Sequence, residues 1–349
     1  MLLWDGFGLQ STHSGIGRYA LEIAEGLETL DRSPLILPSV PDLDPAFKRF
    51  QAPLLECSWG RIKPLSLHAA GRQAGEITRN QAGPHIFHGL SNYNIPKLPS
   101  SFRKVLTVHD LIPFLSRDGV STALRYYLHY QMPKALAAAD RIVCVSQWTA
   151  DCLASIYPQA KSKIQVILNG RPPLLERRQG GANRKLRIFS LGRGETYKRL
   201  SLIPEILQEL PESYEWHLLT DSRGMDALGS IPRLTVYQSL PDDAVRDLWN
   251  RTQIFVHPSL WEGYCLPAAS ALSSCIPSVY TGGSGIDEVV GNAGIQMKAT
   301  DGPKLWARAI EELAQDPQSY RERCHKQWAS LPSWQDVAGQ FLDLYGTLA

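Results

Sequence analysis

Short apolar, β-branched runs alternate in the first half of the chain with longer segments whose apolar residues recur at helical spacing. The longer segments at 14–30 and 121–139 predict helices, the first capped by Ser14 and the second kinked or divided at Pro133. Strands are predicted around them at 34–37, 85–88, 104–109 and 141–146. This alternation predicts βαβ units and a parallel sheet.

The same pattern resumes after 171–185, a stretch of mixed charge with prolines and glycines that predicts a linker. Predicted strands follow at 186–191, 215–219, 234–237, 253–257 and 277–280. Predicted helices lie at 200–210, 242–250, 266–274 and 303–315. A further amphipathic helix is predicted from Trp334 to Leu348, and the pattern alone does not assign it to either half. The chain is therefore predicted to form two α/β domains.

The composition fits two globular domains and excludes some partners. At 349 residues the chain is about twice the usual size of one domain. Its formal charge is only +2, from 36 basic and 34 acidic residues, which argues against a dedicated nucleic-acid-binding protein. The six cysteines include no CxxC pair and predict thiols in a reducing compartment. The first residues do not resemble a signal peptide and no apolar run reaches about 18 residues, so we expect a cytoplasmic protein.

A glycine-rich segment opens the first predicted helix. Gly15 and Gly17 fit the loose pattern G-x-G-x-x-A, and the free amides at a helix start favour a phosphate. In a dinucleotide site the first glycine directly follows strand one, and an acidic residue ends strand two. Here Gly15 comes ten residues after Asp5 and strand two ends at Pro38. The sequence therefore favours an anion loop for another phosphate over a dinucleotide site.

Two candidate phosphate ligands follow the first strand of the second half. Arg193 and Lys198 lie at its predicted carboxyl end, where open α/β sheets bind ligands. A guanidinium suits bidentate contact with a diphosphate, and an ammonium acts as a point charge. From the spacing alone, the alternative is a solvated basic turn.

A second candidate segment, 258–267, lies between a predicted strand and a predicted helix. Amides at that helix start suit a phosphate, and Glu262 can accept hydrogen bonds from sugar hydroxyls. The alternative is that Glu262 is a surface residue of a turn.

Together, these segments and several others resemble glycosyltransferase family 4, the large retaining group with the GT-B fold. The matching stretches, in the order of the family, are SGIGRYALEIAEGL at 14–27, LTVHDLIP at 106–113, ADRIVCVSQWTADCL at 139–153, IQVILNG at 164–170, GRGETYKRL at 192–200, HPSLWEGYCLPAASAL at 257–272, GGSGIDEVVGNAGI at 282–295 and SWQDVAGQFLDLY at 333–345. They span nearly the whole chain, which makes the resemblance far more specific than any single glycine loop.

The resemblance implies the architecture. The family fold consists of two Rossmann-like βαβ domains that face each other across a donor-binding cleft, with a C-terminal helix that crosses back to the first domain. On this chain we expect an acceptor domain at 1–172, completed by the crossover helix at 334–349, and a nucleotide-sugar donor domain at 173–333.

The resemblance also implies a role for each matching residue. The amides of Gly15 to Gly17 approach the donor diphosphate, and His109 lies beside the donor sugar near the anomeric centre. The basic pair on the diphosphate is Arg193 and Lys198. Facing the sugar or the phosphates are Glu262 and the amides of Tyr264, Cys265 and Leu266.

One position departs from the family pattern. Eight residues after Glu262 the family usually has a second glutamate, which holds two ribose hydroxyls, and here that position is Ser270. A serine hydroxyl is shorter and uncharged, so losing the charge-assisted contact would cost on the order of 1.5–3 kcal/mol of nucleotide binding unless another group replaces it. Glu288 is a poor substitute, because its position resembles an acid at a helix start.

The expected chemistry is departure of a diphosphate from the anomeric carbon, with retention of configuration and without a divalent metal. The cations and helix starts would stabilise the leaving group. Asp42 and Asp44 match a D-x-D metal pattern of another glycosyltransferase fold, but they lie in a polar loop. The alternative for His109, with Asp110 beside it, is a hydrogen-bonded structural histidine.

The acceptor side is less defined. We expect His88 and Asp110 to contact the acceptor, a glycan or a lipid-linked glycan. Basic and aromatic residues interleave at 48–72, which suits peripheral contact with an anionic membrane on its inner face, or a solvated loop and helix.

Three functions remain open from the sequence. The first is a retaining hexosyltransferase of polysaccharide biosynthesis, with a UDP-sugar such as UDP-glucose favoured and GDP-mannose as the alternative donor. The second is a catalytically weak nucleotide-sugar-binding scaffold, for which Ser270 is the main argument. The third, a nicotinamide oxidoreductase, lacks the acid after strand two.

Overall fold

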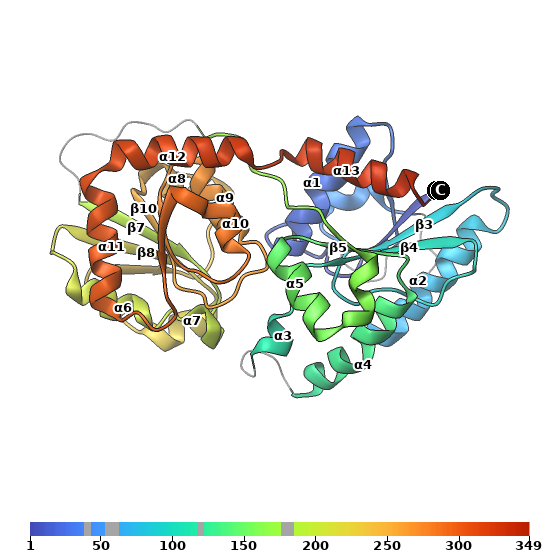
Figure 1. Ribbon diagram of the computed structural model, residues 1–349, viewed down its shortest axis with the longest axis horizontal. Helices are drawn as coiled ribbons and strands as arrows, with labels where there is room; N and C mark the ends of the chain where they lie inside the picture. Colours follow the sequence, from blue (N-terminus) through green and yellow to red (C-terminus); the bar gives the residue numbers. More distant parts are fainter. Residues whose placement is uncertain (38–42, 53–62, 117–121, 176–184, 349) are drawn as a thin grey trace. The chain divides into compact units, whose positions relative to one another are not determined.

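The computed structural model describes residues 1–37, 43–52, 63–116, 122–175 and 185–348 (Figure 1). The chain forms two compact units. The first contains Met1–Leu111, Thr122–Gly170 and Pro332–Ala349, and the second contains Ile112–Ser121 and Arg171–Leu331. Each unit has its own sheet and its own core, and each is described by itself.

The first unit is built on a six-stranded parallel sheet in the order β2-β1-β3-β4-β5-β6. Its strands are β1 (Leu2–Asp5), β2 (Leu35–Leu37), β3 (His85–Gly89), β4 (Phe102–Val108), β5 (Arg141–Cys144) and β6 (Ile164–Val166). In register, Leu3 of β1 pairs with Leu35 of β2 and with Phe87 of β3. All five residues of β3 are buried, as expected for a strand that is covered on both faces.

Helices surround this sheet. They are α1 (Gly15–Thr29), η1 (Pro45–Phe50), α2 (Lys63–Thr78), α4 (Thr122–Ala138), α5 (Gln147–Ile156), η2 (Pro158–Lys163) and α13 (Trp334–Gly346). Ser14 caps α1, as predicted: its side chain accepts a hydrogen bond from the amide of Gly17. Pro133 lies inside α4, which continues through it, so the helix is not divided there, and the kink that we gave as the other outcome stays a prediction.

Helix α13 packs against α1 within the first unit (Figure 1), which confirms the predicted crossover of the C-terminal helix. It begins with a capping box, in which Ser333 and Asp336 satisfy each other's backbone amides. Val337, Phe341 and Tyr345 are buried on the packed side. The helices approach closely where α1 carries Gly26, since a Cβ there would lie 2.6 Å from the Cβ of Ala338.

The second unit contains another six-stranded parallel sheet, in the order β12-β11-β10-β7-β8-β9. Its strands are β7 (Leu186–Leu191), β8 (Tyr214–Leu219), β9 (Leu234–Tyr237), β10 (Ile254–His257), β11 (Ser278–Thr281) and β12 (Gly294–Met297). Its helices are α3 (Ile112–Leu115), η3 (Thr196–Lys198), α6 (Leu202–Glu209), α7 (Ser222–Leu228), α8 (Asp242–Arg251), α9 (Leu266–Ser273), α10 (Ile286–Val290), η4 (Gly291–Ala293), α11 (Pro303–Gln315) and α12 (Pro317–Ser330). Its core includes Ile203, Trp216, Trp306 and Ile310, which are fully buried.

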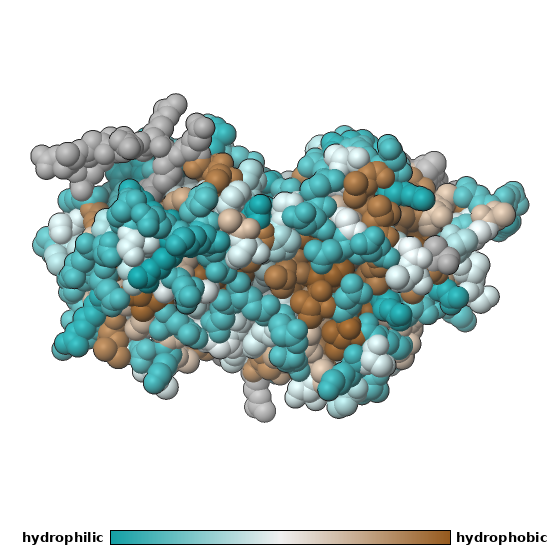
Figure 2. All heavy atoms as spheres, turned by 45° about the horizontal axis from the view of Figure 1, so that its top comes forward, coloured by the Kyte–Doolittle hydropathy of each residue, from teal (hydrophilic) through white to brown (hydrophobic). Residues whose placement is uncertain are grey.

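The two parallel sheets confirm the predicted α/β class with two Rossmann-like domains. The sequence analysis placed the end of β1 at Asp5 without giving its bounds, and it did not predict β6 or β12. The five cysteines among the described residues are free thiols, and Cys57 lies outside those residues. Within the described ranges, no helix is long and apolar enough to span a membrane. Figure 2 shows one face of the molecule, on which hydrophilic residues predominate and hydrophobic residues form smaller areas.

Candidate active site

The parallel topology of the second unit brings two of the predicted segments together. Strand β7 ends at Leu191 and its neighbour β10 ends at His257, so the loops that follow both strands leave the same edge of the sheet. The amide of Leu260 donates a hydrogen bond of 2.8 Å to the carbonyl of Tyr197 and joins the two loops. The basic segment and the acidic segment, about sixty residues apart in sequence, therefore form one site.

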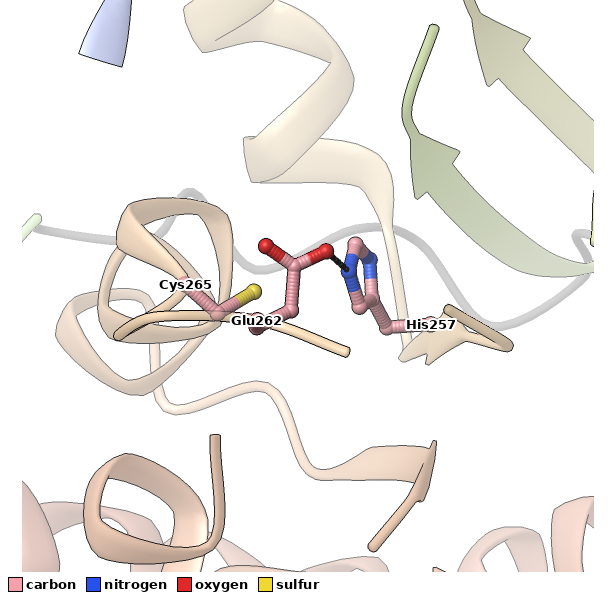
Figure 3. A group of neighbouring side chains, drawn as sticks. All are labelled: His257, Glu262 and Cys265. Carbon is pink, nitrogen blue, oxygen red and sulfur yellow. Dashed lines mark hydrogen bonds and ion pairs between the residues drawn. The ribbon is translucent and has the colours of Figure 1, made fainter. Parts of the chain in front are cut away.

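Glu262 is the centre of this site. The Nζ of Lys198 lies 2.5 Å from its Oε1, and the Nε2 of His257 lies 2.7 Å from the same oxygen. Figure 3 shows His257 and Glu262 pointing toward each other, with Cys265 beside them. The loop is held in place by its backbone, because the amide of Glu262 donates to the Oγ of Ser284 over 3.2 Å. Neither side-chain contact uses Oε2, which is the atom we expect to meet a sugar hydroxyl.

The charges of Lys198 and Glu262 depend on each other. The two side chains are only 13% and 12% exposed. Burial alone would raise the pKa of Glu262, but Lys198 and His257 more than offset it and hold that pKa well below its usual range. Burial likewise opposes the charge of Lys198, and Glu262 outweighs it and raises the pKa of the ammonium. At neutral pH the site therefore contains an ionised, largely desolvated pair.

Arg193, the other predicted phosphate ligand, stands apart from this pair. Its side chain is 70% exposed, and its Nε lies 3.3 Å from the Oε1 of Glu195. The predicted basic pair thus consists of one buried cation that is engaged by Glu262 and one cation that faces solvent.

The start of α9 offers backbone amides beside Glu262. Cys265 precedes the helix at a φ of +80°, and no side chain caps this helix start. The side chains of Tyr264 and Cys265 are buried, so these residues can meet a ligand only through the backbone. The hydroxyl of Ser270 donates to the carbonyl of Leu266 over 3.2 Å, so it can only accept a hydrogen bond from a ribose hydroxyl.

One group in the site has metal-ligating side chains. The ligand atoms of His257, Glu262 and Cys265 lie within 4.8 Å of one another. However, the Oε1 of Glu262 already contacts the ammonium of Lys198, which would repel a cation. Burial, and then the nearby charge of Glu262, raise the pKa of Cys265 well above its usual value, so without a metal the thiol is protonated. The group is better described as an ion-pair cluster than as a metal centre.

The D-x-D alternative is only partly described, because Asp42 lies outside the described residues. The side chain of Asp44 accepts hydrogen bonds from the amides of Thr12, over 2.9 Å, and Ala46, over 3.0 Å. Its carboxylate therefore caps η1 and holds this segment against the loop of Thr12.

His109 follows β4 in the first unit and is held by hydrogen bonds. Its amide donates to the Oδ1 of Asn92 over 2.7 Å, and its Nε2 donates to the carbonyl of Leu90 over 2.8 Å. Because a carbonyl only accepts, the proton is on Nε2 and Nδ1 is the basic nitrogen. Burial lowers the pKa of His109 to about 4, so the ring is neutral at physiological pH. Asp110 is half-buried, and its carbonyl accepts from the Nδ2 of Asn92 over 3.1 Å.

His88 lies wholly inside the first unit. Its Nδ1 is 2.7 Å from the hydroxyl of Tyr345, and its Nε2 is 2.8 Å from the Oγ1 of Thr107. Burial, together with the nearby His109, lowers its pKa to about 3. The predicted acceptor contact does not fit this position, because the ring is inaccessible and connects α13 to the sheet.

The two glycines that open α1 have different surroundings. The amide of Gly17 donates to the Oγ of Ser14 over 2.9 Å, and a Cβ at Gly17 would lie 2.0 Å from the carbonyl oxygen of Ser11. A Cβ at Gly15 would meet nothing within 4 Å. Gly17 is thus required for close packing of the loop, whereas Gly15 leaves its backbone open to a ligand.

His257 was not identified as a site residue from the sequence. A signal was present, since it ends a predicted strand and precedes Glu262 by five residues. However, a histidine at a strand end has no distinctive spacing, and only the fold shows that its ring faces the carboxylate.

Comparison with known proteins gives consistent matches along the chain. A profile described as Glycosyltransferase Family 4 matches residues 13–173, and a profile described as Glycosyl transferases group 1 matches residues 175–329. The chain is 24% identical to O-antigen chain mannosyltransferase B of Escherichia coli, with 96% of both sequences covered. It is 22% identical to O-antigen chain mannosyltransferase RfbU of Salmonella typhimurium over 65% of its own length, and it spans 64% of that relative, slightly less than two thirds.

Solved structures match over the whole chain. Sucrose-phosphate synthase of Thermosynechococcus elongatus superimposes with a TM-score of 0.74 at 14% identity, over 100% of this chain and 99% of that one. Anabaena HepE in complex with UDP and glucose gives a TM-score of 0.73 at 15% identity, with 99% of both chains covered. WaaG, a glycosyltransferase involved in lipopolysaccharide biosynthesis, gives 0.69 at 13% identity over 99% of both. At these identities the likeness is one of fold.

Proposed function

Because this chain belongs to the glycosyltransferases of family 4 and group 1, we propose that it transfers a hexose from a nucleoside diphosphate sugar to a glycan or glycolipid acceptor with retention of anomeric configuration. The observation that carries this proposal is the buried cluster of Lys198, Glu262 and His257 beside the start of α9. It combines a cation, the backbone amides of Tyr264 to Leu266, which no side chain caps, and a carboxylate whose Oε2 takes part in neither side-chain contact.

These groups suit the two parts of a nucleotide-sugar donor. When the bond between the anomeric carbon and the diphosphate oxygen breaks, negative charge develops on the diphosphate and positive charge on the sugar ring. Lys198, Arg193 and the amides at the start of α9 stabilise the diphosphate electrostatically. Glu262 accepts hydrogen bonds from the sugar hydroxyls and holds the ring in place. The acceptor hydroxyl then attacks the face that the diphosphate leaves, and its proton passes to an oxygen of the departing diphosphate.

We also propose a role in this reaction for His109, which belongs to the first unit. Its neutral ring, with the proton fixed on Nε2, presents the basic Nδ1. Near the donor sugar this nitrogen accepts a hydrogen bond from a hydroxyl. A ring with a pKa near 4 is not a general acid at neutral pH.

The sequence and the names of the relatives favour different donor sugars. The sequence favours UDP-glucose, whereas the names of both curated relatives favour a mannosyl donor and an O-antigen acceptor. We therefore propose a polysaccharide acceptor of the O-antigen kind and test UDP and GDP donors first.

Contact with a membrane belongs to the same proposal, although most of the basic stretch 48–72 lies outside the described side chains. Flotation with anionic vesicles tests this contact, and a protein that stays at the bottom of the gradient would contradict it.

The first experiment is a thermal-shift panel of UDP, GDP, ADP and TDP with their common sugars, each with EDTA and with magnesium. A ligand that binds only the folded protein raises the unfolding temperature by mass action. We expect one nucleotide to give the largest shift, with the same size in both buffers because Lys198 and Arg193 replace a metal. A shift that requires magnesium would contradict the metal-independent mechanism. A protein that binds its nucleotide sugar but neither hydrolyses nor transfers the sugar would support the scaffold function instead.

A further inference from the structure

Two guanidinium groups meet one buried carboxylate at the ends of β7 and β8. The Oε1 of Glu195 lies 3.0 Å from the Nη2 of Arg223 and 3.3 Å from the Nε of Arg193. The Glu195 side chain is only 7% exposed, whereas those of Arg193 and Arg223 are 70% and 55% exposed. The carboxylate is therefore the fixed member of the group, and the cations extend from it toward solvent.

The loops that carry this group are locked together by a second carboxylate. The Oδ1 of Asp221 accepts hydrogen bonds from the amides of Gly194, over 2.9 Å, and Gly224, over 3.1 Å. The loops also touch directly, since a Cβ at Gly194 would lie 2.5 Å from the nitrogen of Gly224. The Oδ2 of Asp221 accepts from the Nη2 of Arg223 over 3.1 Å. Glu195 thus lies on a loop that Asp221 holds against the loop of Gly224.

Arg193 is held in a way that leaves its binding edge open. Its contact with Glu195 is made through Nε. In the part of the chain that the structure describes, no residue accepts a hydrogen bond from its two Nη groups. A guanidinium binds a phosphate most strongly through two parallel N–H donors, and holding the Nε side turns the outer pair toward a ligand.

Stability does not explain why the carboxylate is buried. The Oε2 of Glu195 is buried, and none of the residues that the structure describes forms a hydrogen bond with it. Burying a charged oxygen without a partner is unfavourable, and ion pairs with exposed arginines contribute little to folding. A buried polar atom without a partner requires an explanation other than stability, and a functional role is one such explanation.

We propose that Glu195 is a positioning residue, which orients the Arg193 guanidinium for the distal phosphate of the donor and shares its charge with Arg223. The proposal rests on the proposed function, because it requires a nucleoside diphosphate as the leaving group. Glu195 itself does not touch the donor, and its effect reaches the phosphate only through Arg193.

The test measures binding of the preferred nucleoside diphosphate and of its monophosphate by titration calorimetry. In Glu195→Gln, which keeps the shape but loses the charge, we expect the diphosphate to bind about tenfold more weakly and the monophosphate to change by less than about twofold, because only the diphosphate reaches Arg193. Glu195→Asp keeps the charge but shortens its reach, so we expect a similar loss. The matched control is Glu212→Gln, since Glu212 is 90% exposed and pairs with Arg233 over 3.3 Å.

A double-mutant cycle distinguishes two roles of Glu195: orienting the Arg193 guanidinium, or only holding the two loops together. If Glu195 acts through Arg193, then Glu195→Gln has no further effect on diphosphate binding in an Arg193→Ala background. Additive losses, or an equal loss of monophosphate and diphosphate binding, would overturn the proposal. If the unmodified protein binds neither UDP, GDP, ADP nor TDP, the proposed function falls and this inference falls with it. If the unmodified protein binds a diphosphate and Glu195→Gln binds it equally well, only this inference falls.

Discussion

At the scale of single residues, Lys198 and Glu262 illustrate why a buried ion pair is sensitive to the loss of one partner. Each charge is largely removed from water and is stabilised by the other. Removing one partner leaves an uncompensated buried charge, whereas removing both leaves none.

We therefore predict that Lys198→Met destabilises the protein by about 3–5 kcal/mol and lowers kcat/KM by about 100-fold or more. The double variant Lys198→Met/Glu262→Gln should regain part of the stability but none of the activity. Urea unfolding and donor-turnover assays measure the two effects. The exposed Lys304→Met variant is the control. A Lys198→Met variant as stable as the unmodified protein would mean that the pair does not form.

Two histidines of the first unit, His88 and His109, predict a pH dependence of stability. Their pKa values in the folded protein are about 4 for His109 and about 3 for His88, below the usual value of about 6.5. Between about pH 6.5 and pH 4 the unfolded chain binds protons at these positions and the folded protein does not. The contribution of these histidines to the unfolding free energy is therefore complete above about pH 6.5. It decreases as the pH is lowered, by up to about 1.4 kcal/mol per pH unit for each histidine.

Urea unfolding at several pH values between about 7 and 5 measures this slope. In His88→Gln, the slope of the unfolding free energy against pH should decrease by the contribution of one histidine, up to about 1.4 kcal/mol per pH unit. In His68→Gln, at an exposed position on α2, the slope should not change. An unfolding free energy that does not change over this range would contradict the prediction.

The site shows what the sequence can and cannot indicate at this scale. Arg193, Lys198 and Glu262 were predicted as site residues because they follow strands at positions where parallel sheets bind ligands, and their roles stay predictions. The contact between Lys198 and Glu262 was not found, because it joins residues 64 positions apart and depends on which strands are neighbours. His88 was interpreted wrongly for a related reason: its partner Tyr345 is 257 residues away.

At the scale of secondary-structure elements, the packing of α13 on α1 depends on one glycine. Gly26 lies inside α1, and a Cβ there would lie 2.6 Å from the Cβ of Ala338. Alanine would favour the helix by about 1 kcal/mol relative to glycine, but overpacking costs about 1–3 kcal/mol.

We expect Gly26→Ala to lower the unfolding free energy by about 1 kcal/mol, and Gly26→Ala/Ala338→Gly to recover part of the loss. Gly339→Ala is the opposite case on α13, because a Cβ there meets nothing within 4 Å. This substitution should stabilise by up to about 1 kcal/mol. Thermal and urea unfolding of the three variants test the packing, and a stabilised Gly26→Ala would contradict it.

The elements themselves were predictable to different degrees. Strands that are largely buried, such as β3, β5 and β10, were predicted within one or two residues of their bounds. Strand β6, with the sequence IQV, and β12, with GIQM, are short and partly exposed, so their apolar signal is weak. Helix α4 runs through Pro133, since tertiary packing overrides the local preference for a break.

At the scale of the whole molecule, the first unit is discontinuous in sequence. Its sheet and all its helices except α13 precede Arg171–Leu331, the main part of the second unit, and α13 follows that segment. The amphipathic pattern of 334–348 predicted this helix but not its partner. The family resemblance was needed to predict that it returns to the first unit.

Removing residues 332–349 should therefore damage the first unit selectively. The truncated chain would expose the surfaces that Phe341, Leu344 and Tyr345 cover, and it would leave His88 without the Tyr345 hydroxyl. Hydrogen exchange should show lost protection in β1, β3 and β4, with protection in β7 and β10 retained. Equal loss in both sheets would contradict the division into two units.

The position of α13 also sets an order for maturation on the ribosome. Strands β1 to β6 leave the exit tunnel early, but the helix that completes their packing is translated only after the 161 residues of Arg171–Leu331. Since nascent chains fold as they emerge, at about 5–20 residues per second, the first unit waits about 8–32 seconds for its final helix while the residues of the second unit are translated. Chaperones that scan emerging polypeptides would thus encounter the first unit incomplete in every nascent copy, and synthesis that stops before α13 would yield an incomplete product that proteases can recognise.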